Sequence, residues 1–136
     1  MGRLKKSRDV ITVLEAFTNF KHLNDSRLVI LGEGPEKNNL IKYVKNNNIQ
    51  NYVKFKGFVE DTYKYYCAAD LYIHSSLYDA MPLTLIEALV CNTKILSTDC
   101  KYGPIEILKK DKLGIIIKTN DKNEMLKGFD KALNTK

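Results

Sequence analysis

The chain has 136 residues, the length of one ordinary domain. Its 44% hydrophobic and 28% charged residues, with only 7 Gly and 3 Pro, exclude disordered and low-complexity classes, and no apolar run approaches the roughly 20 residues of a membrane helix. The net charge of +6 fits either a lysine-rich solvated surface or an anionic partner such as a phosphate-bearing ligand or an acidic membrane face, but no basic-aromatic cluster suggests nucleic acid.

Helices and strands alternate in the first half of the chain. Apolar residues recur at helical spacing over 8–22 and predict an amphipathic helix there. The continuous apolar run over 27–31 predicts a strand buried on both faces. A helix is then expected from Pro35 to about Asn46, followed by a strand over 52–55 and a helix near 61–68.

The alternation continues to the end of the chain. The expected elements are a strand over 71–74, a loop over 75–81, a helix from Pro82 to about Cys91, a strand over 94–97, a helix from Pro104 to about Lys109, a strand over 114–117 and a last helix from Asp121 to near Leu133. This order predicts an α/β fold, a Rossmann-like, open, mostly parallel sheet with helices on both faces, in a single domain spanning 1–136.

All three prolines, Pro35, Pro82 and Pro104, stand where a strand and its loop give way to a helix. In a parallel sheet these helix starts share the carboxyl edge, where open α/β sheets bind their ligands. For any one proline, the simpler interpretation is favoured, namely that it only stops a strand and starts a helix.

The cysteines indicate no metal or redox site. Three is an odd number, and the spacings match no zinc or redox motif. Cys67 and Cys91 have apolar neighbours and are expected to be buried as small hydrophobic residues. Unpaired thiols without a secretion signal indicate a reducing cytoplasm.

Two segments could carry chemistry. Gly32-Glu33-Gly34 follows a strand, but a dinucleotide fingerprint would need a third glycine at position 37, where a lysine stands, so a tight turn is favoured. The helix start near 80–84 offers free N–H groups to an anion, and Asp79 there would complement the helix dipole.

Glu87 has no such local explanation, because it lies more than a turn inside the helix among apolar neighbours. A buried carboxylate in that position needs a partner, and a ribose diol would serve as one. A solvated helix face remains the alternative.

The second segment resembles family 4 glycosyltransferases, which are retaining enzymes of GT-B architecture. The resemblance rests on Asp79, seven intervening residues, and Glu87 within the run Pro82–Ala88. Further matches follow in the family's order and cover nearly the whole chain: Gly2–Leu4, Glu15–Phe17, Leu28–Pro35, Val53–Val59, Ala69–Ser75 and Gly103–Leu108.

The resemblance implies a binding site for a nucleotide diphosphate sugar, with no metal and no other cofactor. Arg3 and Arg8 would bind the diphosphate, although the family usually has Lys at the second position and Gly where Asp9 follows it. Glu87 would bind the ribose. The remaining implied positions are Val59 in the loop beside the base and Ala80, Met81, Pro82 and Leu83 at the helix start.

Asp79 is the catalytic candidate that the resemblance implies, beside the transferred sugar. The family usually has Glu there, and Asp is one methylene shorter. Two further positions differ from the family's usual glycine, at Ala80 and Asn92, and asparagine tolerates a left-handed turn.

The resemblance further implies that the chain is the C-terminal, donor-binding half of a larger enzyme whose N-terminal acceptor domain is absent. The intact protein would transfer a hexose with retention in bacterial surface polysaccharide or glycolipid synthesis. It would be cytoplasmic or in peripheral contact with the inner face of the membrane. The isolated domain is expected to be inactive.

Two other interpretations remain open. One is a module that binds a nucleotide sugar without transferring it. The other is an unrelated doubly wound protein such as a receiver domain or a flavodoxin, although a receiver would need an acidic cluster after its first strand, and none is found.

Overall fold

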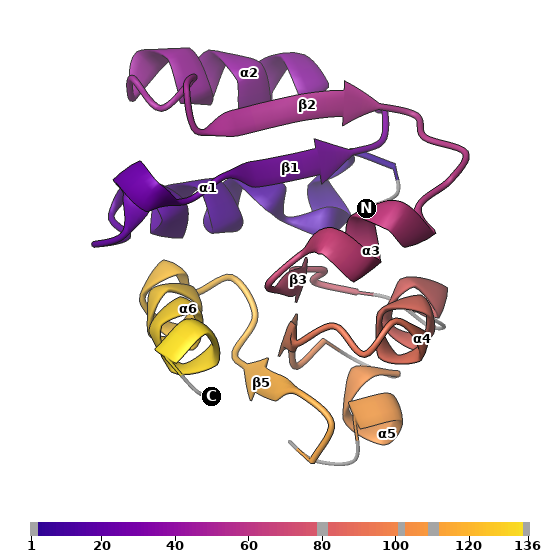
Figure 1. Cartoon of the computed structure of the whole chain (residues 1–136). Coiled ribbons are helices and arrows are strands. Elements are labelled where there is room, and N and C mark those ends of the chain that lie inside the picture. Colours follow the sequence, from indigo (N-terminus) through magenta and orange to yellow (C-terminus); the bar gives the residue numbers. More distant parts are fainter. Residues whose placement is uncertain (1–2, 79–81, 101–102, 109–111, 135–136) are drawn as a thin grey trace.

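The computed structural model describes residues 3–78, 82–100, 103–108 and 112–134. The elements alternate as predicted (Figure 1). In chain order they are η1 (Lys6–Arg8), α1 (Val10–Thr18), η2 (Leu23–Asp25), β1 (Leu28–Leu31), α2 (Lys37–Asn46), β2 (Val53–Gly57), α3 (Tyr63–Ala68), β3 (Tyr72–His74), α4 (Leu83–Val90), β4 (Ile95–Thr98), α5 (Pro104–Leu108), β5 (Ile115–Ile117) and α6 (Lys122–Asn134).

Every strand pair in this part of the chain is parallel, as the alternation predicts. The strands nevertheless form two sheets instead of one continuous sheet. β1 pairs with β2, and β3, β4 and β5 pair in that order. Figure 1 shows the pair β1–β2 on one side of the molecule and the second sheet on the other.

Helices cover both faces of the second sheet because neighbouring residues on a strand point to opposite faces. On β4, Ile95 packs in a cluster with Tyr66 of α3 and Leu85 of α4. The next residue, Leu96, packs in the larger cluster with residues of α1 and α6. The layered arrangement predicted from the sequence is therefore present.

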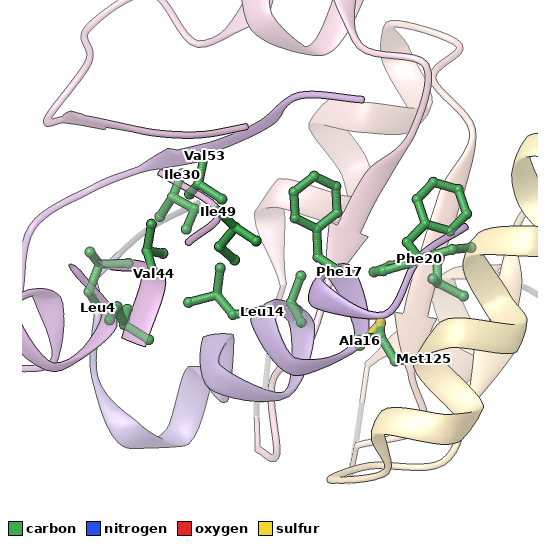
Figure 2. Packing of buried hydrophobic residues seen from close by; sticks show 14 of the residues in the cluster. Leu4, Leu14, Ala16, Phe17, Phe20, Ile30, Val44, Ile49, Val53 and Met125 are labelled. Carbon is green, nitrogen blue, oxygen red and sulfur yellow. The ribbon is translucent and has the colours of Figure 1, made fainter. Parts of the chain in front are cut away.

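The larger cluster joins the two halves of the molecule through α1. Figure 2 shows side chains of this helix, among them Leu14, Ala16 and Phe17, between the β1–β2 side and Met125 of α6. Leu14 is fully buried, and Phe20 makes an edge-to-face contact with Phe129 at 5.7 Å between ring centroids. Burial of this apolar stripe is what holds α1 between the strands and α6.

The predicted helix over 8–22 is shorter than expected and is divided. Asp9 adopts a left-handed conformation, with φ of 50°, between η1 and α1. A residue in that region ends one helical segment before the next begins, which periodicity alone does not reveal. After Thr18 the chain turns, and η2 precedes β1.

The cysteine prediction was wrong for both residues. Cys67 on α3 is exposed, and Cys91 at the end of α4 is half-buried, whereas Cys100 is buried. Tyr66 beside it is buried, but Ala68 and Ala69 are exposed, and the Cys67 thiol lies next to the thiol of Cys91. Among the helices described, none is long and apolar enough to cross a bilayer.

Candidate functional site

The N-terminal segment lies across the carboxyl ends of β1 and β3. The N–H of Leu4 donates to the carbonyl of Glu33 just after β1, at 2.8 Å. On the other side, the N–H of Leu77 donates to the carbonyl of Ser7 at 2.8 Å. These bonds bring both arginines predicted as binding residues to the edge where open α/β folds bind ligands.

Arg3 and Arg8 line the same cavity, together with Ser75 and Ser76. Arg8 Nη1 donates to Ser76 Oγ at 3.3 Å, and Ser75 Oγ donates to the carbonyl of Arg8 at 2.6 Å. Arg3 is exposed, and Arg8 is half-buried. Two guanidinium groups beside buried hydroxyls form a setting suited to a phosphate-bearing anion.

The loop after β3 is fixed by a hydrogen bond from the Thr98 hydroxyl, a residue that the sequence analysis did not single out. Thr98, at the end of β4, is almost fully buried, and its Oγ1 donates to the carbonyl of Ser76 at 2.6 Å. Ser76 itself is 2% exposed. The sequence does show a threonine at the carboxyl end of a predicted strand. Only the pairing of β3 with β4 shows that this threonine fixes the loop after β3.

The backbone conformation at Asp9 explains why glycine is usual at this position in the family that the sequence resembles. Its left-handed backbone is a conformation that glycine adopts freely and aspartate tolerates. Asp9 is 7% exposed, and its carboxylate accepts a hydrogen bond from Thr12 Oγ1 at 2.8 Å. Burial, more than the nearby charge of Glu15, raises the pKa of Asp9 above its ordinary value, against the opposing hydrogen bond from Thr12.

The raised pKa of Asp9 predicts that the stability of the fold decreases as the pH rises. The folded chain binds this proton more tightly than the unfolded chain, so the Asp9 contribution to stability falls as the pH rises from the ordinary value of 3.8 to the raised folded value. Asp9→Asn should remove that contribution and stabilise the chain at pH 7 relative to wild type. Urea unfolding of both proteins from pH 3 to 7 would measure the difference, with the exposed Asp25→Asn as control. A constant difference across this range would contradict the assignment.

Glu87 has a partner that the sequence did not reveal. Tyr66 on α3 is 1% exposed, and its hydroxyl donates to Glu87 Oε2 at 2.9 Å. Burial, the neighbouring Tyr72 and the Glu87 carboxylate all raise the pKa of Tyr66, so the hydroxyl keeps its proton and remains a donor. One oxygen of Glu87 is thereby oriented, and the side chain is half-buried rather than solvated.

The remaining predicted site residues differ in exposure, and three of them lie outside the described residues. Pro82 is buried and caps α4, Leu83 is 62% exposed, and Val59 is half-buried just after β2. Asp79, Ala80 and Met81 lie outside the described residues. Tyr66 lines the cavity that the two arginines line, whereas Glu87, its hydrogen-bond acceptor, does not line it.

The family profile described as "Glycosyl transferases group 1" matches residues 1–136. A curated relative from Campylobacter jejuni, N-acetylgalactosamine-N,N'-diacetylbacillosaminyl-diphospho-undecaprenol 4-alpha-N-acetylgalactosaminyltransferase, is 31% identical over 133 residues. That match covers 98% of this chain and 36% of the relative, so the chain spans about a third of the relative's length.

Two solved structures share the fold. A TarM variant of Staphylococcus aureus, in complex with Fondaparinux, alpha-GlcNAc-glycerol and UDP, has a TM-score of 0.90 and 25% identity, over 98% of this chain and 28% of that one. The C-terminal domain of a glycosyl transferase group 1 family protein (LpcC) from Francisella tularensis has a TM-score of 0.86 and 22% identity, over 99% of this chain and 73% of that one.

Proposed function

From the finding that the chain belongs to the glycosyl transferases group 1 family, with the Rossmann-like fold of a GT-B C-terminal domain, we propose that it binds the nucleotide diphosphate sugar of a retaining glycosyltransferase. The observation that carries this proposal is the meeting of Arg3 and Arg8 at one cavity beside Ser76. A diphosphate carries the charge that two guanidinium groups at a sheet edge can bind.

Each remaining contact has a proposed role. Glu87, with one oxygen oriented by Tyr66, accepts hydrogen bonds from the ribose hydroxyls. The main chain around Val59 holds the base. At the start of α4, the N–H groups of Ala80, Met81 and Leu83 would face the phosphates, while Pro82, which has no N–H, would fix the first turn. Asp79 would lie beside the transferred sugar.

The proposed chemistry is hexosyl transfer with retention and without a metal ion. Arg3, Arg8 and helix-terminal N–H groups would stabilise the negative charge that develops on the leaving diphosphate. The acceptor would be bound by an N-terminal domain of the same full-length protein, so the 136 residues alone would transfer no sugar.

The proposed setting is the synthesis of a bacterial surface polysaccharide or glycolipid, in the cytoplasm or at the inner face of the membrane. This setting is supported by the name of the Campylobacter jejuni relative, which includes a diphospho-undecaprenol substrate. The second candidate is a module that binds the nucleotide sugar and transfers nothing. The basis for that candidate is the share of the relatives that this chain covers, about a third.

Calorimetric titration with UDP, GDP and ADP against the corresponding monophosphates tests the binding proposal. The second phosphate should add at least one charge-assisted hydrogen bond, so the matching diphosphate should bind tighter by about 1.5–3 kcal/mol. Equal affinities in all three series would contradict a diphosphate site at the arginine pair.

Glu87→Ala should weaken binding of the matching ribonucleotide by about 1–3 kcal/mol, because charge-assisted hydrogen bonds to the ribose are lost. The deoxyribonucleotide should lose a similar amount with the wild-type chain and little more with Glu87→Ala. Titrating both nucleotides against both proteins completes this cycle. If the two losses add instead, Glu87 acts through the fold and not through the ribose.

A further inference from the structure

Two of the three cysteines are in contact although they lie on different helices. Cys67 is in the last turn of α3, and Cys91 directly follows the last residue of α4. Their thiols share a hydrogen bond. Their spacing in the sequence matches no redox motif, so only the packing of α3 beside α4 reveals the pair.

The two thiols differ in how open they are to solvent. Cys67 is exposed, whereas Cys91 is half-buried and packs against the cluster that contains Tyr66 and Leu85. A reagent in solution therefore reaches the Cys67 thiol first. The Cys91 thiol is then the nearest group that can react with whatever Cys67 has bound.

The backbone next to both cysteines is fixed by hydrogen bonds between and within the two helices. Tyr66, the residue before Cys67, donates its hydroxyl to Glu87 Oε2 at 2.9 Å. The carbonyl of Tyr66 accepts a hydrogen bond from Thr93 Oγ1 at 2.7 Å, and the carbonyl of Glu87 accepts one from the N–H of Cys91 at 3.2 Å. These bonds hold the two thiols near each other.

The surroundings of Cys91 keep its thiol protonated while Cys67 is reduced. Burial, then the hydrogen bond and charge of Cys67, and then the charge of Glu87 raise the pKa of Cys91 above its ordinary value. Once the Cys67 sulfur is bonded to a reagent, it carries no charge and no longer opposes the ionisation of Cys91. The thiolate of Cys91 is thus favoured at the step that needs it as a nucleophile.

We propose that Cys67 and Cys91 are a redox-active pair that closes to a disulfide between α3 and α4, with a low-molecular-weight disulfide as the co-reactant. The Cys67 thiolate attacks one sulfur of the co-reactant, so a mixed disulfide forms and one thiolate leaves. The Cys91 thiolate then attacks Sγ of Cys67, and the second thiolate leaves. The two leaving thiolates take up the protons that the cysteines released, and the co-reactant gains the two electrons that the pair loses.

The disulfide would close residues 67–91 into a loop that contains β3 and α4. Such a cross-link restricts the unfolded chain more than the folded chain and therefore stabilises the fold. The exposed side chain of Cys67 can turn toward Cys91 while the buried ring of Tyr66 stays in place, so the hydrogen bond to Glu87 should persist. The oxidised pair would then hold α4 and the ribose-binding carboxylate firmly against α3, a role in binding that rests on the proposed function.

The test is oxidation of the 136-residue chain by glutathione mixtures of increasing oxidised fraction, with mass spectrometry of its peptides. In wild type the main product should be the Cys67–Cys91 disulfide, which lacks two hydrogen atoms and is reversed by dithiothreitol. Cys91→Ser should stop at a glutathione adduct on Cys67 that persists at least about tenfold longer than in wild type, because a neighbouring thiol reacts as an intramolecular nucleophile. Cys100→Ala keeps both thiols of the pair and should behave like wild type.

Thermal unfolding in the absence of nucleotide is the second readout, so its result is separate from the titrations that test the proposed function. The oxidised wild type should unfold about 5 °C or more above the reduced form, and Cys67→Ser should show no such difference. A lasting adduct on Cys67 of the wild type, or a disulfide through Cys100, would overturn the proposal. An internal disulfide that left the unfolding temperature unchanged or lowered it would overturn it as well.

Discussion

Replacing Arg3 and Arg8 together by alanine is expected to weaken the binding of UDP, or of whichever diphosphate the chain prefers, at least about 100-fold. Each guanidinium is expected to contribute a charge-assisted hydrogen bond of about 1.5–3 kcal/mol, and two such losses exceed 3 kcal/mol. Both side chains line the same cavity, and each is expected to contact the diphosphate, so one arginine should not compensate for the loss of the other. Calorimetry with the diphosphate would measure the loss.

The same segment offers matched controls. Lys6→Ala removes an exposed cation two residues from Arg8 and should change affinity only slightly, since an exposed charge is screened. Arg8→Lys keeps the charge but loses the planar fork that reaches Ser76, so its affinity should fall between those of wild type and Arg8→Ala. Equal losses for Lys6→Ala and Arg8→Ala would indicate general electrostatic attraction instead of a built site.

Gly34→Ala should destabilise the fold by about 3 kcal/mol, because the added methyl group has no space. A Cβ at Gly34 would lie 2.6 Å from the nitrogen and 2.7 Å from the carbonyl carbon of Leu4, and closer still to its oxygen. These are backbone atoms, so the N-terminal segment itself must move. The hydrogen bonds of Leu4 to Glu33 and Glu36, at 2.8 and 2.9 Å, would be lost or strained.

Urea unfolding would measure the loss of stability, and titration would show whether the displaced segment takes Arg3 away from the diphosphate. Gly128→Ala is the matched control. Its Cβ would lie 2.6 Å from Cδ1 of the fully buried Leu96, so this variant should also lose stability, but it leaves the N-terminal segment in place and should not change the affinity for the diphosphate. A Gly34→Ala chain as stable as wild type would mean that Leu4 is not held against the turn.

The glycine turn illustrates the limits of prediction from local patterns. The sequence favoured a tight turn over a phosphate loop at Gly32-Glu33-Gly34, and the main chain there bonds to Leu4 instead of being left free for an anion. What the pattern could not indicate is that Gly34 is required for the close approach of a segment 30 residues away. Such an approach depends on how β1 and the N-terminal segment are packed.

Hydrophobic periodicity and turn residues by themselves determined the order of helices and strands and the parallel pairing, and they indicated the carboxyl edge of the sheet as the ligand edge. These features follow from residues within one turn of each other or from the rules of β-α-β connection. Arg3, Arg8 and Glu87 were assigned to a site there only through the resemblance to the glycosyltransferase family. Only the tertiary structure decided which distant side chains support them. Tyr66 and Glu87 are 21 residues apart, and Arg8 and Ser76 are 68 apart, so their contacts depend on which strands become neighbours. The division of the sheet was likewise undetectable from local pattern, because every strand present has a normal strand sequence and the break lies between β1 and β3.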